Sequence, residues 1–199
     1  MLRRPGGLSL IFFILSNTLQ METYIALLRG INVSGHNMIK MDELKRVLAG
    51  LDFSGITTYI QSGNITFNTE NAYPDDLAGL IAGKILQRFG LTVPVMIRTL
   101  AEMEQISRNN PFSADPTRNP EKFHVTFLSA IPGVEREQKI HEFNFPPDEF
   151  VIHGKECYLY CPDGYGRTKL TPQFFESKLK VMTTTRNWKT IIHLATHNT

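Results

Sequence analysis

The chain has 199 residues, of which 42% are hydrophobic and 20% are charged. These values are ordinary for a soluble globular protein that forms one large domain or two small ones. The formal net charge is +2, and Arg3 and Arg4 account for the whole excess, so residues 21–199 are neutral. A neutral domain lacks the electrostatic field that drives non-specific nucleic-acid binding, so any such contact must use a local patch.

The first twenty residues have the composition of a short leader. Arg3 and Arg4 precede an apolar run at residues 8–15, which is too short to span a bilayer. The small residues of a signal-peptide cleavage site are missing after this run. We therefore expect translation to start at Met21, with residues 1–20 resulting from an upstream start. A secretory signal or a membrane-associated leader is the alternative.

The first half of the chain alternates between strand and helix patterns. Residues 23–28 are apolar almost throughout, which predicts a strand in the centre of a sheet. The polar loop 29–40 follows, and residues 41–51 carry apolar side chains at helical spacing. Two runs rich in β-branched and aromatic residues, 56–61 and 64–68, flank a Ser-Gly turn and predict a hairpin.

A second helix and a fourth strand complete this half. Pro74 suits the first turn of a helix and Gly90 the position after its end, so a helix is predicted over residues 74–89. Residues 92–98 have a strand pattern. The resulting order βαββαβ is that of a ferredoxin-like unit, which we predict for residues 21–99.

The second half, residues 100–199, shows a similar order without a recognisable sequence repeat. A connecting helix, a strand, a helix, a hairpin and a helix are predicted at residues 100–109, 122–129, 134–143, 149–161 and 171–180. Where a last strand would come, residues 183–189 indicate a threonine-rich turn, and residues 187–197 keep helical spacing. We therefore predict an α+β fold with an imperfect βαββα second half and an extra C-terminal helix.

The two cysteines, Cys157 and Cys161, lie on one predicted strand and share a face with Leu159. Four residues of strand separate them by about 13 Å, which is too far for a disulfide. We expect two buried core thiols rather than a redox or metal site. Free thiols suit the reducing cytoplasm.

The hairpin and the loop after the first strand define a candidate site. In a βαββαβ sheet, the end of the first strand and the tip of the hairpin lie at the same edge. Polar side chains concentrate at both places, and those expected to bind a ligand are Arg29, Asn32, Lys40, Gln61, Ser62 and Asn64. Amides, hydroxyls and a guanidinium around flexible glycines suit a polar or anionic ligand. The alternative is that these side chains join the loops to each other and cap backbone groups.

A second polar concentration lies near the C-terminus, where residues 164–190 contain six basic side chains and one acidic side chain. The side chains expected to contact phosphates are Arg167, Lys169, Arg186 and Asn187, and the rings of Tyr165 and Trp188 are suited to stack on a base. The alternative is a solvated helix face with Trp188 in the core.

Several common catalytic and cofactor motifs are absent. Residues 30–35 have the glycine spacing of a phosphate-binding loop, but no Lys-Ser or Lys-Thr pair follows them. His193 and His197 are one helical turn apart without an evident third ligand. Ser62 is not part of a G-x-S-x-G motif, and no carboxylate pair stands out for acid–base chemistry. We predict no metal and no cofactor, and whether the protein is an enzyme stays open.

Five motifs occur in order along the chain: Ala26-Leu-Leu-Arg-Gly-Ile-Asn-Val-Ser-Gly35, Ile39-Lys-Met-Asp-Glu-Leu44, Tyr59-Ile-Gln-Ser-Gly-Asn64, Gly166-Arg-Thr-Lys-Leu170 and Thr185-Arg-Asn-Trp188. Together they resemble the bacterial domain-of-unknown-function family 1697 over about residues 21–197. Two positions depart from the family pattern: Ser34 stands where a glycine is typical, and Thr168 where a serine is. The resemblance implies a two-part α+β fold with ferredoxin-like character and no established activity.

The favoured hypothesis is a cytoplasmic binding protein for a phosphate-bearing ligand, either a nucleotide or a nucleic acid, with the two polar clusters as two walls of one site. One alternative is an enzyme acting on a small polar substrate, with Ser62 or the amides positioning it. Another is a protein-interaction or structural role, in which the motifs join the two halves. No membrane association is expected for residues 21–199, and the sequence identifies no protein partner.

Overall fold

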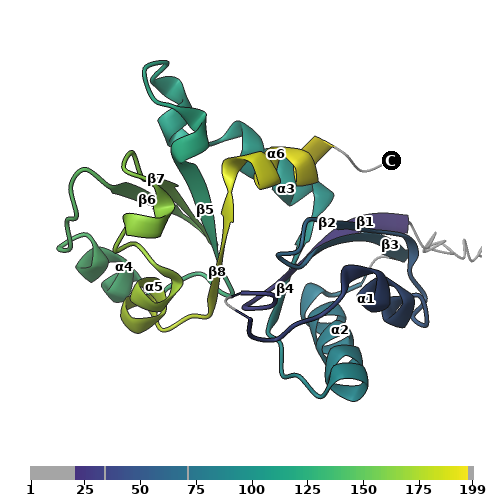
Figure 1. Cartoon of the computed structure of the whole chain (residues 1–199). Helices are drawn as coiled ribbons and strands as arrows, with labels where there is room; N and C mark the ends of the chain where they lie inside the picture. The colour runs from purple at the N-terminus through teal and green to yellow at the C-terminus, as the bar shows by residue number, and fades with distance from the viewer. Residues whose placement is uncertain (1–20, 34, 71, 197–199) are drawn as a thin grey trace, which may run out of the picture.

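The computed structural model describes residues 21–33, 35–70 and 72–196, so the predicted leader lies outside the described residues. The chain forms two four-stranded antiparallel sheets (Figure 1). The first has the strand order β2-β3-β1-β4, from β1 (Met21–Leu28), β2 (Ser54–Tyr59), β3 (Asn64–Glu70) and β4 (Val95–Thr99). The second has the order β6-β7-β5-β8, from β5 (Phe123–Leu128), β6 (Glu149–His153), β7 (Glu156–Tyr160) and β8 (Thr183–Asn187).

Helices cover the sheets. They are α1 (Met41–Leu48), α2 (Pro74–Phe89), α3 (Leu100–Arg108), α4 (Val134–Ile140), α5 (Pro172–Leu179) and α6 (Trp188–Thr196), with short 3₁₀ turns at Pro111–Ala114, Pro120–Lys122 and Tyr165–Arg167. The pair α1 and α2 lies on the outer side of the first sheet, and α4 and α5 lie on the outer side of the second (Figure 1). The pair α3 and α6 packs together between the two sheets. No helix in the described ranges is long and apolar enough to cross a bilayer.

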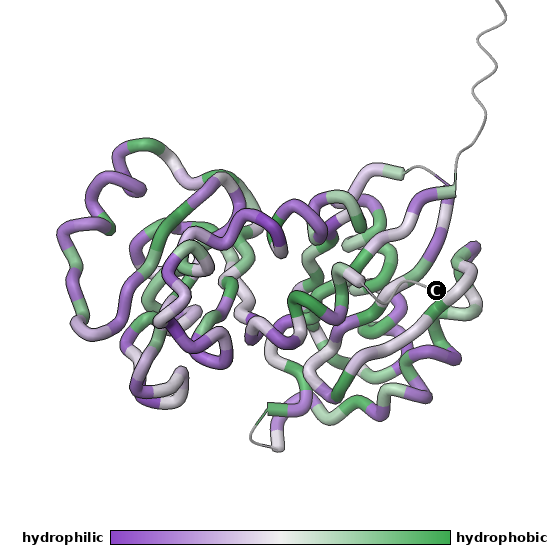
Figure 2. Tube along the Cα trace, turned by 90° about the horizontal axis from the view of Figure 1, so that it is seen from above, coloured by the Kyte–Doolittle hydropathy of each residue, from purple (hydrophilic) through white to green (hydrophobic). Residues whose placement is uncertain are grey.

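Apolar side chains form a core on both faces of each sheet. Leu44 of α1 and Ile81 of α2 pack against Phe67 in the outer core of the first half. The central core joins the halves, because it contains Ile25 of β1 together with Val125 of β5. Figure 2 shows apolar segments gathered inside both lobes and polar segments along the outer connections. Neither half can therefore bury both faces of its sheet without the other.

The α+β prediction is confirmed, with one element missed. Residues 183–187 form the edge strand β8 rather than a turn, so the second half has the order βαββαβ before α6. The sequence hides this strand because threonines occupy its buried positions instead of apolar residues. Thr183 and Thr184 are buried, and the Thr185 hydroxyl lies 2.8 Å from that of Thr126. Threonine is β-branched and fits a pleated strand, provided that its hydroxyl finds a partner.

Both halves use the same strand register. Ile25 of β1 is paired with Arg98 of β4, and Val125 of β5 is paired with Arg186 of β8. Arg98 and Arg186 therefore occupy equivalent positions, although the flanking sequences show no recognisable repeat. Each strand of one sheet therefore has a counterpart in the other sheet.

The connections between equivalent elements differ in length. The first strand and first helix are joined by residues 29–40, twelve residues, in the first half and by residues 129–133, five residues, in the second. The third strand and second helix are joined by residues 71–73, three residues, in the first half and by residues 161–171, eleven residues, in the second. Each half therefore enlarges a different loop beyond the frame that the two share.

The prediction for the cysteines is confirmed. Cys157 and Cys161 are free and buried in the outer core of the second half, beside Leu159. Burial raises the pKa of Cys161 to about 11 and raises that of Cys157 as well. Both side chains are protonated packing groups at neutral pH.

Candidate ligand-binding site

Arg186 crosses from β8 into the first half. Its Nε donates to Asn64 Oδ1 at 2.5 Å, and its Nη2 donates to the carbonyls of Leu28 at 2.7 Å and Ser62 at 3.1 Å. Its Nη1 donates to the Thr184 hydroxyl and the Thr185 carbonyl. Every N–H of the guanidinium is thus directed at a protein acceptor. Arg186 is 7% exposed, and burial lowers its pKa to about 10, so it is still charged at neutral pH.

Arg98 makes the equivalent crossing in the other direction. From β4, its Nη2 donates to the carbonyls of Leu128 at 3.0 Å and Lys155 at 3.2 Å, and its Nε donates to Glu156 at 2.9 Å. The register makes Glu156 the counterpart of Asn64, since these residues pair with equivalent positions of β5 and β1. The two arginines therefore join the halves reciprocally. Sequence analysis missed Arg98; the available signal was a single charged residue directly after the apolar run at 93–97.

The hairpin tip and the loop 29–40 are also joined by side chains. Asn32 donates through Nδ2 to the carbonyls of Ile39 and Gln61, both at 2.9 Å, and accepts from the Ile39 N–H at 2.8 Å. Asn64 donates to Ser62 Oγ at 2.9 Å. The predicted proximity of loop and hairpin is therefore observed, and these contacts are those of the alternative in which the side chains join the loops.

The other predicted residues of the first cluster lie around this junction. Arg29 forms an ion pair with Glu176 of α5, with 2.8 Å between Nη2 and Oε2. Lys40 and Gln61 are exposed, and together with Asn32 they line a pocket of about 300 Å³. The other residues that line this pocket are Met38, Ile39, Glu43 and Phe89. In the C-terminal cluster, Asn187 Oδ1 accepts from the Thr190 N–H at 2.8 Å and so caps α6.

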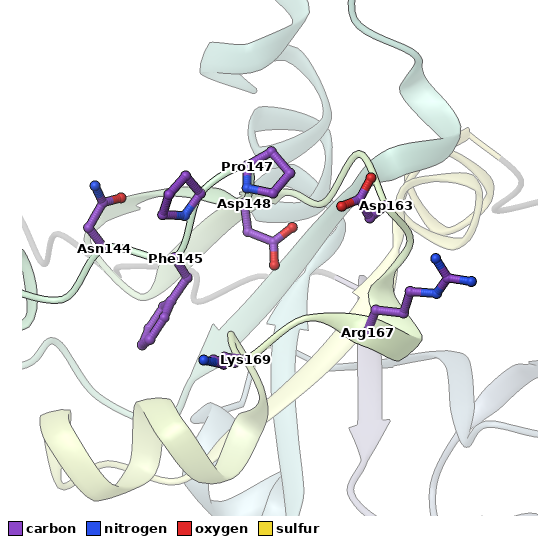
Figure 3. Close-up of a pocket in the computed structure, with 8 residues that line it drawn as sticks. Asn144, Phe145, Pro147, Asp148, Asp163, Arg167 and Lys169 are labelled. Carbon is purple, nitrogen blue, oxygen red and sulfur yellow. The ribbon is translucent and has the colours of Figure 1, made fainter.

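Arg167 and Lys169 lie elsewhere, in a pocket of about 310 Å³ in the second half (Figure 3). It is lined by Asn144, Phe145, Pro146, Pro147, Asp148, Asp163, Arg167 and Lys169. These residues come from the enlarged connection 161–171 and from residues 141–148, eight residues where the first half has five. No residue of the first cluster lines this pocket. The two predicted clusters therefore do not form two walls of one common pocket here.

The charges in this pocket are mixed. Lys169 Nζ lies 5.8 Å from the centroid of the Phe145 ring, and Figure 3 shows Asp148 pointing into the opening between the two loops. In the described part of the chain, the side chains of Arg167 and Lys169 form no hydrogen bond or ion pair, and neither do those of Asp148 and Asp163. The pocket thus presents two cations and two carboxylates whose hydrogen-bonding capacity is unused.

His193 of the predicted histidine pair and Trp188 do not contribute to these two pockets. Residues 21–33, 35–70 and 72–196 hold no group of three His, Cys, Asp or Glu side chains arranged for a metal. His193 stacks on Tyr59, and His197 of the predicted pair lies outside the described residues. Trp188 is half-buried and packs against the central core.

The geometry describes a two-sheet α+β protein with its enlarged loops around small polar pockets. Residues 21–158 match the family described as protein of unknown function, DUF1697, and the chain belongs to this family. A conserved bacterial protein from Streptococcus pneumoniae has a similar fold, with a TM-score of 0.69 and 20% sequence identity over 89% of this chain and 98% of that chain. No curated protein matches the sequence.

Proposed function

We propose that this protein binds a small phosphate-bearing molecule in the pocket of Arg167 and Lys169. The proposal rests on one observation: two cations whose side chains form no hydrogen bond or ion pair among the described residues share one pocket. A guanidinium and an ammonium are the side chains that best donate charge-assisted hydrogen bonds to phosphate oxygens. The pocket is built by loops that exceed their counterparts in length, which supports a role beyond the shared frame.

The carboxylates narrow the class of ligand. Asp148 and Asp163 line the same pocket as the cations, so they repel a polyanion and accept hydrogen bonds from hydroxyl or amino groups. A volume of about 310 Å³ is at the small end of ligand pockets. A mononucleotide or a sugar phosphate fits these requirements better than a nucleic acid, and the neutral charge of residues 21–199 agrees with this choice.

Calorimetric titration with adenosine 5′-monophosphate and with inorganic phosphate tests the proposal. The double variant Arg167→Ala/Lys169→Ala is expected to bind about tenfold or more weakly, because each charge-assisted hydrogen bond contributes about 1.5–3 kcal/mol. Lys189→Ala is the matched control, since Lys189 belongs to the same basic stretch but lies outside the pocket. Equal losses in both variants, or no binding by the natural protein, would contradict the proposal.

A structural role for the sequence motifs has its own support. Arg186 with Asn64, and Arg29 with Glu176, connect the two halves. Under this role, substitution of these residues lowers thermal stability and leaves ligand affinity unchanged. Ser62, through which an enzyme would position a substrate, accepts from Asn64 in the same junction. The cytoplasmic location remains a prediction from the free thiols.

A further inference from the structure

A cleft lies between α3 and the β6–β7 hairpin, and the shared register relates its position to the place where β2 meets α6. Tyr59 of β2 pairs with Asn64, and His153 of β6 pairs with Glu156. Because Asn64 and Glu156 are equivalent, His153 is the counterpart of Tyr59. Both residues end the outer edge strand of their sheet, where it approaches the helix that follows the edge strand of the other half.

The helices provide the second correspondence. Thr99 and Asn187 end the equivalent strands β4 and β8, and α3 and α6 begin at the next residue. Counting six residues from each strand end makes Gln105 of α3 the counterpart of His193 of α6. The pair His153 and Gln105 in one junction thus corresponds to Tyr59 and His193 in the other.

The two junctions are filled differently. The rings of Tyr59 and His193 stack with their centroids 3.6 Å apart and an interplanar angle of 18°. At the equivalent place, His153 and Gln105 line a cleft of about 220 Å³. One junction of the molecule therefore contains a stacked ring pair, and the other contains space where such a ring would lie.

The cleft carries hydrogen-bonding groups on one wall. Gln105 lies in the last turn of α3, Asn109 follows the end of this helix, and both line the cleft. Both are exposed, and within the described residues neither side-chain amide forms a hydrogen bond. The phenolic ring of Tyr158 also lines the cleft, and its hydroxyl donates to the Ile106 carbonyl at 3.4 Å.

The acids beside the cleft are already engaged. Glu102 Oε2 accepts from the Thr99 N–H at 2.7 Å, and Glu156 pairs with Arg98. The groups left for a ligand are thus neutral amides, an imidazole and the exposed Lys155. The two amides and the imidazole favour a ligand with a flat face and a polar edge.

We infer that this cleft binds a single planar nitrogen heterocycle, of the nucleobase type. Its ring lies against His153, as the His193 ring lies against Tyr59 in the other junction, and its edge bonds to Gln105 and Asn109. Asn and Gln amides pair in a bidentate manner with the edge of adenine, and aromatic rings gain from offset stacking. The cleft is smaller than ordinary ligand pockets, which limits the ligand to one ring system. The inference is independent of the phosphate site.

Side-chain amide shifts in ¹H–¹⁵N spectra of the natural protein test it, with adenine as the probe. Adenine is expected to shift the signals of Gln105 and Asn109. A second pair of probes tests whether the ligand ring must be planar. 2-Pyridone and 2-piperidone present the same lactam edge, but the ring of 2-piperidone is saturated. The planar lactam is expected to bind several-fold more tightly. Equal affinity for the two lactams, or no amide shift with adenine, overturns the inference.

The double variant Gln105→His/His153→Tyr copies the stack of the other junction into the cleft. It is expected to lose adenine binding by about tenfold or more and to melt at a higher temperature, because a stacked ring pair adds a favourable contact to the fold. If this variant does not fold, Gln105→Leu at the exposed helix position gives the same loss of affinity. Unchanged adenine affinity in the folded variant overturns the inference.

Discussion

Arg98 and Arg186 each carry a guanidinium from an edge strand into the opposite half of the molecule. They differ in their counter-charge: Arg98 pairs with Glu156, whereas Arg186 meets Asn64 and backbone carbonyls. A buried charge is tolerated when its hydrogen bonds are satisfied, and the five N–H groups of Arg186 meet that condition. Its removal takes the guanidinium donor away from two buried acceptors, the Leu28 carbonyl and Asn64 Oδ1.

We expect Arg186→Ala to lower the free energy of unfolding by about 3–5 kcal/mol. Arg186→Lys is also destabilising, because a single ammonium cannot reach all the acceptors that lie around the edge of the planar guanidinium. Urea unfolding measures both variants. Arg108→Ala is the control, since its exposed pair with Glu104 contributes under about 1 kcal/mol. A loss no larger than that of the control would show that Arg186 does not hold the halves together.

The buried thiols are expected to make the stability of the fold depend on pH. The pKa of Cys161 is about 11 in the folded chain and about 8.5 in an unfolded one. The folded state therefore binds more protons between these two pKa values. The contribution of Cys161 to the free energy of unfolding is fully present below about pH 8.5 and is lost as the pH rises toward 11.

The urea midpoint is expected to fall over this pH range, and to fall less in Cys161→Ala. Near neutral pH, both thiols are expected to resist a disulfide-exchange reagent until the protein unfolds, because they are buried. An equal fall of the urea midpoint with pH in the natural protein and in Cys161→Ala, or rapid labelling of the thiols in the folded chain, would contradict this account.

At the scale of elements, the β2–β3 hairpin is fixed by close packing at its tip. A Cβ placed on Gly63 would lie 2.7 Å from Leu28 Cβ and 2.8 Å from Ile31 Cδ1, and Gly63 has φ +75°. We expect Gly63→Ala to cost about 2–4 kcal/mol from overpacking and left-handed strain together.

Gly90→Ala separates these two contributions. Gly90 has φ +67° at the end of α2, but a Cβ there would have no neighbour within 4 Å. Its cost is expected to be about 1–2 kcal/mol, from the left-handed conformation alone. Thermal unfolding of both variants measures the difference, and equal costs would mean that the hairpin tip is not closely packed.

Sequence patterns were sufficient to predict a helix or strand where that element is apolar or is bounded by turn residues. The apolar run before Arg29 predicted β1, and Pro74 with Gly90 predicted the ends of α2. They were insufficient for β8, because threonines occupy its buried positions: the Thr183 hydroxyl donates to the Pro172 carbonyl, and the Thr184 hydroxyl accepts from Arg186. The role of Arg98 depends on contacts 30 or more residues away, which no local pattern contains.

The candidate site was only partly predictable for the same reason. Arg167 and Lys169 were selected as basic residues in a glycine-flanked loop, but Asp148 and Phe145 reach the pocket from another connection. Arg186 was selected for its charge, although the fold uses that charge internally. Which polar residues face solvent is decided by the packing of the two halves.

At the scale of the whole molecule, the central core makes the two halves interdependent. Ile25 and Val125 belong to the same cluster as residues of α3 and α6. We therefore expect one cooperative unfolding transition in calorimetry, with equal calorimetric and van't Hoff enthalpies. Arg98→Ala should lower the temperature of this single transition. Two separate transitions would show that the halves fold independently.

The binding of a phosphate-bearing molecule is tested most directly by locating it. Adenosine 5′-monophosphate is titrated into the natural protein, and backbone amide shifts are mapped by NMR. The account predicts shifts concentrated at residues 144–148 and 163–169, the two loops of the Arg167 and Lys169 pocket. Shifts confined to the pocket of Lys40 and Gln61, or no shifts at all, would contradict it.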